Sequence, residues 1–131
     1  MRKDIHIPEV KNVFIAAVKE YPQDSDNYEW VVYILNNQLQ DLKLVIVVSQ
    51  GFSKQDKSST LRKTIQMLPQ KSFAKLEILP EELFKLTNTY KLSFFSDNKL
   101  FDKTYTFDKN VIKDSSLETI PLLSLKGILA K

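Results

Sequence analysis

Apolar residues gather in two runs near the centre of the chain, separated by a short polar segment. The runs Trp30–Leu35 and Leu42–Val48 are rich in Val, Ile, Tyr and Trp, and neither has a clean polar face. This composition is typical of central strands that are buried on both sides. The polar segment, with Asn36 and Asn37, predicts either a hairpin loop or a short connection that crosses between sheets. We expect Glu29–Phe52 to form the middle of the fold.

Four further stretches alternate apolar and polar residues with the period of two that is typical of β-strands. They are Asn12–Lys19, Ser72–Leu79, Tyr90–Ser96 and Leu100–Phe107. The last two predict a hairpin closed by Asp97-Asn98, because Asn and Asp tolerate the positive φ angles that a two-residue turn requires.

The second of these strands has a clear division of faces. Its pattern places Ala74, Leu76 and Ile78 on a buried face. Lys75 and Glu77 fall on the opposite, polar face. The pattern therefore predicts a half-buried strand.

The segment Thr60–Leu68 fits two patterns. Leu61, Ile65 and Leu68 have the spacing of a helical stripe, whereas Leu61, Ile65 and Met67 fit strand alternation. Its β-branched residues favour a strand, which is our prediction, and a helix remains the alternative.

Two other segments have weaker patterns. Pro80-Glu81-Glu82 predicts the start of a short helix that ends at about Leu86, since proline and acidic residues are favoured in a first turn. Ile120–Leu123 is apolar enough to pack against the body of the protein. The irregular pattern of Val111–Lys131 does not predict where this tail lies.

Seven strands and one short helix predict an all-β fold, a single immunoglobulin-like β-sandwich domain that spans residues 1–131. An α+β fold would follow if Thr60–Leu68 were helical. The Cys–Trp–Cys signature of antibody domains is missing, so the likeness is one of architecture. We expect Trp30 and Tyr33 to be core residues.

The composition is that of an ordinary soluble domain. The chain has 131 residues, of which 43% are hydrophobic and 27% charged, which suits a single domain with its own core. The apolar runs are much shorter than the roughly 18 residues of a membrane helix, and we expect neither a membrane segment nor a signal peptide. Cysteine is absent, which excludes disulfides and thiolate sites and fits a cytoplasmic location.

The net charge of +3 comes from 19 basic and 16 acidic residues, and the basic residues are all lysines except Arg2 and Arg62. Sequence-specific nucleic-acid readers rely on arginine, whose planar fork grips phosphates and guanine edges. Here the lysines are interleaved with Asp and Glu, which is typical of an evenly charged soluble surface.

The chain resembles a family of small uncharacterised bacterial proteins. The residues that carry the resemblance are Trp30-Val31-Val32-Tyr33, Asn36-Asn37, Val47-Val48-Ser49, Gly51-Phe52, Ser59-Thr60-Leu61-Arg62, Leu68-Pro69, Ser72, Lys75-Leu76-Glu77, Asp102-Lys103 and Phe107. They span most of the chain, but they are fold-pattern residues and not a chemical motif, so the resemblance implies no established activity. Some members are labelled as a phenylalanyl-tRNA synthetase subunit. A domain this short and glycine-poor has no room for an ATP and amino-acid site.

The sequence contains few residues that could form a catalytic, cofactor or metal site. The single histidine, His6, lies near the N-terminus without partners for a catalytic triad or a metal site. The chain has no GxGxxG or Walker pattern, and neither Gly51 nor Gly127 has glycine neighbours that could cradle a phosphate. We therefore expect no cofactor, no metal and no enzymatic activity.

Three charged residues within predicted strands are candidates for an interaction or an ion pair. Arg62 would form a structural ion pair or contact an acidic ligand. Glu77 and Asp102 would be partly buried carboxylates, each with a lysine such as Lys75 or Lys103 as its partner.

Three functions follow as hypotheses. The first is a non-enzymatic interaction or scaffold module with an unknown protein partner, using the loop Gly51–Ser59 and the edge near Thr60–Leu68. The second is weak RNA or tRNA binding by lysines and hairpin aromatics, although we expect these aromatics, namely Tyr90, Phe94, Phe101, Tyr105 and Phe107, to form core. The third is a small hydrolase or isomerase that uses Glu77 or Asp102.

Overall fold

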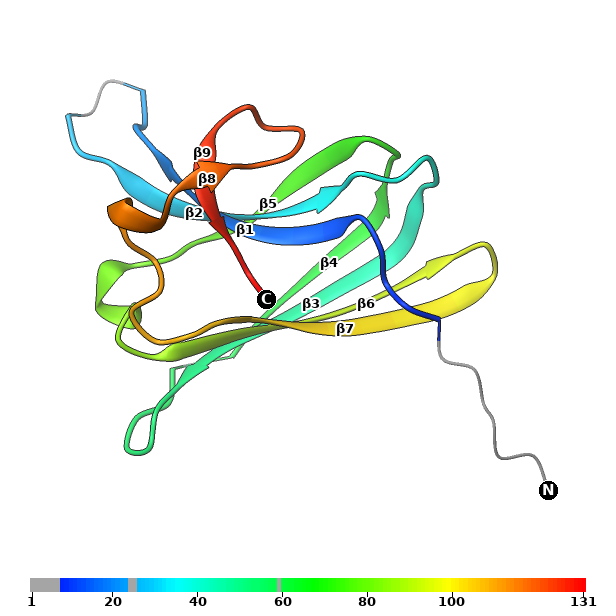
Figure 1. The fold of residues 1–131 in the computed structure, drawn as a ribbon. Helices are drawn as coiled ribbons and strands as arrows, with labels where there is room; N and C mark the ends of the chain where they lie inside the picture. The colour runs from blue at the N-terminus through cyan, green and yellow to red at the C-terminus, as the bar shows by residue number, and fades with distance from the viewer. Residues whose placement is uncertain (1–7, 24–25, 59) are drawn as a thin grey trace.

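Two antiparallel β-sheets pack face to face in the computed structural model, which describes residues 8–23, 26–58 and 60–131 (Figure 1). One sheet has five strands in the order β5-β2-β1-β9-β8, and the other has four in the order β4-β3-β6-β7. The strands are β1 (Val13–Glu20), β2 (Glu29–Asn36), β3 (Leu42–Phe52), β4 (Leu61–Leu68), β5 (Ser72–Ile78), β6 (Thr87–Ser96), β7 (Lys99–Phe107), β8 (Glu118–Thr119) and β9 (Lys126–Leu129).

The predicted all-β, immunoglobulin-like sandwich is confirmed. The seven predicted strands correspond to β1–β7, and the connections β2–β3, β4–β5 and β5–β6 each pass from one sheet to the other. Thr60–Leu68 contains strand β4, so the helical alternative and the α+β fold are wrong. The β6–β7 turn has the predicted geometry, since Asp97 and Asn98 have φ angles of 52° and 59°.

The central stretch Glu29–Phe52 is not a hairpin. Strand β2 lies in the five-stranded sheet and β3 lies in the four-stranded sheet, so the polar segment between them is a crossing connection. Strand β3 also continues beyond the apolar run Leu42–Val48 and through Gly51 to Phe52. Each of the two strands is internal to its own sheet.

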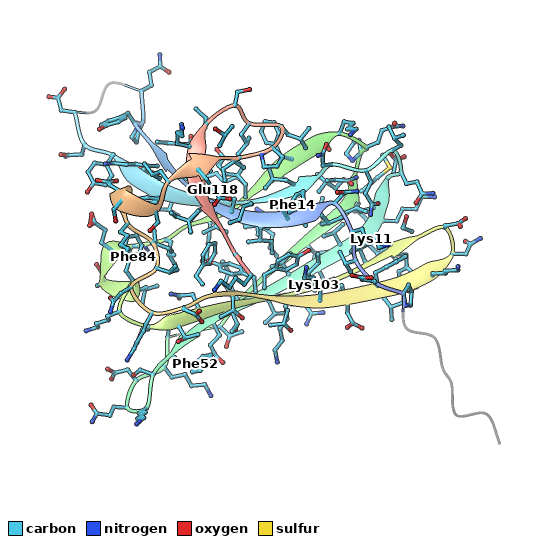
Figure 2. The ribbon with its side chains drawn as sticks, in the orientation of Figure 1. Lys11, Phe14, Phe52, Phe84, Lys103 and Glu118 are labelled. Carbon is cyan, nitrogen blue, oxygen red and sulfur yellow. The ribbon has the colours of Figure 1, made fainter. Side chains whose placement is uncertain are left out.

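The core lies between the inner faces of the two sheets, where side chains fill the space (Figure 2), and it is rich in aromatic residues, as predicted. Its buried members include Trp30, Tyr90, Phe94, Tyr105 and Phe107, and Phe101 packs against them. The Tyr105 hydroxyl donates a buried hydrogen bond of 2.5 Å to the carbonyl oxygen of Val13 and thereby links the two sheets.

Tyr33 was expected in this core, and that prediction is wrong. Trp30, Val32 and Ile34 point into the main core, so the alternating residue Tyr33 lies on the outer face of the five-stranded sheet. There its ring meets that of Phe73 edge-on, with centroids 5.8 Å apart.

The predicted short helix is a single 3₁₀ turn, η1 (Glu81–Leu83), and it does not extend to Leu86. The side-chain amide of Asn88 donates hydrogen bonds to the carbonyl oxygens of Leu83 and Leu86. One further bond of the i→i+3 type joins the Leu86 N–H to the Leu83 carbonyl oxygen at 3.0 Å, and β6 then begins at Thr87, so no longer helix forms. A second 3₁₀ turn, η2 (Asp114–Ser116), was not predicted.

The tail packs back on the body, as the apolar segment Ile120–Leu123 predicted. It covers the outer face of the five-stranded sheet, where Ile120, Leu122 and Leu123 form a second small core with residues of β1 and β2. Strands β8 and β9 of this tail were not predicted, because they are too short to show a clear alternation.

The last residues of the tail join the two sheets along one side. Strand β9 pairs with β1, and the following Ala130 N–H donates to the carbonyl oxygen of Ile15. Lys131 then exchanges two backbone hydrogen bonds, of 2.8 and 3.0 Å, with Thr106 of β7 (Figure 1, red). The opposite side, bounded by the edge strands β4 and β5, is connected by the turn at Pro69–Lys71.

The side chain of Asn36 holds two sheet-to-sheet connections together. Its amide nitrogen lies 2.8 Å from the carbonyl oxygen of Gln40 in the β2–β3 connection. The same nitrogen lies 3.2 and 3.0 Å from the carbonyl oxygens of Leu68 and Pro69, where β4 leads into β5. Asn36 is fully buried, so these carbonyls have little access to water in its absence.

We expect Asn36→Ala to lower the free energy of unfolding by about 2–3 kcal/mol, because it leaves buried carbonyl groups without donors. Asn37→Ala is the matched control, since Asn37 is less buried and its side chain accepts a solvent-exposed hydrogen bond from Lys71. Urea denaturation of both variants measures the difference. Equal losses in the two variants would contradict a special role for Asn36.

Candidate functional site

A β-bulge turns the carboxylate of Glu77 toward the inside of the sandwich. Lys75 pairs with Tyr33, but Glu77 pairs with the next residue of β2, Val32, so Leu76 is an extra residue in β5. A bulge places two consecutive side chains opposite one residue of the partner strand. Since Val32 belongs to the main core, Glu77 follows Leu76 inward.

The same bulge reverses the predicted faces of this strand end. Glu77 was assigned to the polar face and Ile78 to the buried face, and both assignments are wrong. Ile78 pairs with Val31, whose side chain lies on the outer face, and it is 47% exposed. A shift of one residue exchanges the two faces, because side chains alternate with a period of two.

Glu77 lines a recess of about 200 Å³ between the two sheets, on the side bounded by β4 and β5. The Tyr90 hydroxyl donates a hydrogen bond of 2.7 Å to Glu77 Oε2. Burial, with the negative charge and the hydrogen bond of Glu77, raises the pKa of the Tyr90 phenol above its usual range. The partner of this carboxylate is therefore a neutral phenol from the core and not the lysine that we had expected.

Arg62 and Asp102 lie on a different surface, the outer face of the four-stranded sheet. Both are exposed and both line a shallow hollow of about 380 Å³, whose floor includes Ile46 and Val48. Strand pairing arranges the residues of this face in two neighbouring rows that cross the sheet from β4 to β7. The first row is Arg62, Val48, Lys91 and Thr104, and the second is Thr64, Ile46, Ser93 and Asp102.

The structure thus brings two of the three predicted residues to one face and places Glu77 elsewhere. Among the described residues, neither Arg62 nor Asp102 has an ion-pair partner within 4 Å. Glu77 likewise has no basic partner in the described part of the chain. The exposed charges of Arg62 and Asp102 are consequently available to a ligand.

An apolar patch on the same sheet was missed by the sequence analysis. It consists of Leu44, Met67, Phe95 and Leu100, which are between 41% and 52% exposed. The first three line a hollow of about 570 Å³ beside the β6–β7 turn, and Leu100 pairs with Phe95 across β6 and β7. We call these four residues the apolar patch.

A second bulge presents Leu44 in this patch. Strand β3 has one extra residue between Lys43 and Ile46 relative to β6, and Leu44 adopts a left-handed φ of 49°. Leucine rarely occupies that region, because its Cβ crowds the backbone there. Leu44 belongs to the apolar run Leu42–Val48, so its exposure to solvent could not be predicted from the pattern.

Other predicted features lie inside the protein or outside its described part. Tyr90, Phe94, Tyr105 and Phe107 point into the core, and Phe101 packs against them. The hairpin therefore presents a single aromatic side chain, Phe95, on the outer face of the four-stranded sheet, where an RNA-binding sheet stacks bases on several. His6 is outside the described residues. Within the described ranges, no cluster of His, Asp and Glu could hold a metal ion, and no helix is long and apolar enough to cross a membrane.

We expect Tyr90→Phe to lower the free energy of unfolding by about 1–3 kcal/mol, because Glu77 then points inward without its donor. The double variant Tyr90→Phe with Glu77→Leu should recover part of this loss, since it removes the unpaired carboxylate as well. Chemical denaturation of the two proteins measures the recovery. A double variant that is less stable than Tyr90→Phe would contradict this account.

Three buried or partly buried phenols predict a loss of stability at alkaline pH. Burial raises the pKa of Tyr33 to about 12, and it also raises the pKa values of Tyr90 and Tyr105. In the unfolded chain these phenols titrate near pH 10, so their contribution is complete below that pH. It is lost as the pH rises through the folded-state pKa values.

The free energy of unfolding should therefore fall between pH 10 and pH 12, and tyrosinate absorbance should rise late while the protein stays folded. Denaturant titrations at several pH values, with absorbance near 295 nm, measure both effects. Tyr33→Phe should remove part of the pH dependence. A constant free energy of unfolding across this range would contradict the prediction.

Comparison of the chain with models of protein families, with curated proteins and with solved structures finds no match in any of the three. The resemblance to a family of small uncharacterised bacterial proteins therefore stays a prediction. The function has to be inferred from the surfaces described above.

Proposed function

We propose that this chain is a non-enzymatic interaction module that binds a protein partner with the outer face of its four-stranded sheet. The observation that carries the proposal is the apolar patch, because four large apolar side chains on one exposed sheet surface are typical of an interaction site. Arg62 and Asp102 lie beyond Ile46 and Val48 on the same face and extend the surface with charges.

The two sheets differ in what covers their outer faces, and this difference supports the proposal. The sequence predicted that both central strands are buried on two sides. For β2 this holds, because the tail covers its outer residue Leu35. The corresponding residues of β3, Ile46 and Val48, remain at the floor of an open hollow. A bound partner would bury them and give β3 the second covered face that its composition indicates.

The charges on this surface favour a partner with acidic groups. Arg62 and Lys91 lie in one row of the sheet, and Asp102 lies in the next. The surface therefore has a local excess of positive charge, which contributes to partner choice and to association rate. A guanidinium without an ion-pair partner among the described residues is well suited to a bidentate contact with a carboxylate.

The other two hypotheses have weaker support. RNA binding rests on the sequence pI of about 9.0 and on dispersed lysines, because the hairpin aromatics are turned inward. Hydrolysis by paired carboxylates would need a second acidic group near Glu77, and Glu77 is the one carboxylate among the described residues that line its recess. A cytoplasmic location remains part of our proposal and fits a chain without cysteine.

Photo-crosslinking tests the proposal. A benzophenone side chain at position 95 should form covalent adducts with one partner in a cell extract, and the same group at position 73 should not. Phe73 is the matched control, because it is similarly exposed (47% against 41%) but lies on β5 of the other sheet. Mass spectrometry of the adducts identifies the partner.

Binding of that partner should then depend on Phe95. We expect Phe95→Ser to weaken binding at least tenfold, since exposed aromatic anchors dominate interface energies. Phe73→Ser should leave binding unchanged, and both variants should remain folded. Equal amounts of adduct at positions 95 and 73 would overturn the proposal. It would also be overturned if the protein retarded RNA in a gel-shift titration and formed no protein adduct.

A further inference from the structure

The recess that holds Glu77 is lined by several groups that can accept a hydrogen bond. Three of its donor groups are already engaged. The Tyr90 hydroxyl donates to Glu77 Oε2, and the Asn88 amide nitrogen donates to the carbonyl oxygens of Leu83 and Leu86. The Gly51 N–H donates to Ser58 Oγ at 2.7 Å.

Four oxygen atoms that can accept a hydrogen bond lie on residues of the lining, and one of them, the Ser49 hydroxyl, can also donate. They are Glu77 Oε1, Tyr90 Oη, Asn88 Oδ1 and the hydroxyl of Ser49. Asn88 Oδ1 lies beside Gly51, where a Cβ atom would come within 2.6 Å of it. Glycine at this position therefore keeps the approach to Asn88 open. Asn88 and Ser49 are both buried, at 4% and 7% exposure.

Part of the wall is apolar. Leu61, Leu79 and Leu83 form this part, and Gln50 and Ser58 complete the lining. Leu61, on the edge strand β4, is exposed. At about 30 Å³ for each water-sized group, a recess of about 200 Å³ holds a group of roughly six or seven non-hydrogen atoms. A suitable ligand thus combines a positively charged, donor-rich head with a short apolar stem.

We propose that this recess binds an organic ammonium group on a short alkyl chain, with Glu77 as its counter-ion. An ammonium group has three N–H donors and no acceptor, which matches a lining of one carboxylate and several neutral acceptors. A divalent metal ion prefers several charged ligands, whereas this site has a single carboxylate. The site is separate from the apolar patch, so it does not rest on the proposed function.

The ammonium group has two possible sources with the same chemistry. One is a free small amine, and the other is the lysine side chain of a chain segment that lies along the edge strand β4. Strand β4 pairs with β3 on one side, and its other edge borders the recess through Leu61. An extended segment there would add a strand to the sheet and could direct a lysine between the two sheets.

Titration of the ¹⁵N-labelled protein with n-butylammonium tests the site by nuclear magnetic resonance. We expect saturable shifts of the Ser49, Gly51 and Asn88 amides, with a dissociation constant on the order of 1 mM, which is typical of a fragment-sized ligand. n-Butanol has the same stem without the charge, and tetramethylammonium has the charge without donors. Both controls should bind at least tenfold more weakly.

Matched variants connect the binding to Glu77. Glu77→Gln keeps an acceptor for Tyr90 but removes the charge, and it should weaken butylammonium binding at least tenfold. Asp102→Asn removes an exposed carboxylate from the other surface and should change nothing. Leu61→Trp adds bulk to an exposed position at the recess and should block binding without loss of the fold.

The two sources are separated by comparing butylammonium with Nα-acetyl-lysine methylamide and with a three-residue peptide centred on lysine. Peptide binding that is more than tenfold tighter and also shifts the amides of β4 identifies a lysine side chain, whereas equal affinities identify a free amine. Either result supports the site. The proposal would be overturned by amide shifts of equal size with butanol, or by equal losses of butylammonium affinity in Glu77→Gln and Asp102→Asn. It would also be overturned if butylammonium caused no saturable shift up to about 50 mM.

Discussion

The buried amide of Asn36 is the contact on which the arrangement of the two sheets most depends. In a sandwich, the connections between sheets fix how the two layers lie on each other, and two of these connections meet at this side chain. One amide group thus positions the start of β3 and the end of β4 together. Leu44 and Met67, which belong to those two ends, acquire their shared position in the apolar patch from this arrangement. The outer surface therefore depends on a hydrogen-bonding group that has no contact with solvent.

The strands could be predicted from the sequence, because alternation and β-branched composition follow directly from the geometry of a pleated strand. The orientation of certain side chains could not. A bulge adds one residue to one strand of a pair, and its position is decided by the partner strand, which lies far away in the sequence. In β5 the apolar pattern continued through Ile78, yet pairing with β2 turned Glu77 inward instead. In β3 the apolar run concealed that Leu44 faces solvent.

The position of the tail could not be predicted from its apolar residues either. Its apolar residues predicted burial, but the surface that they bury is made of alternate residues of β1 and β2 more than eighty positions earlier in the chain. The candidate residues Arg62, Glu77 and Asp102 were chosen by chemistry and by location within strands. Their division between an outer face and an inner recess follows from strand order and register, which local sequence does not contain. The apolar patch was missed for the same reason, because its four residues come from four different strands.

The left-handed backbone of Leu44 sets stability against the proposed function. At this position a glycine would remove the crowding of a Cβ atom, which costs an L-residue roughly 1–2 kcal/mol, and so would favour the folded state. It would also delete one side chain of the apolar patch. A substitution chosen for stability alone would thus replace this leucine. A design programme that ranked substitutions by folding energy would alter this position early and would weaken the surface by which the protein, in our proposal, recognises its partner.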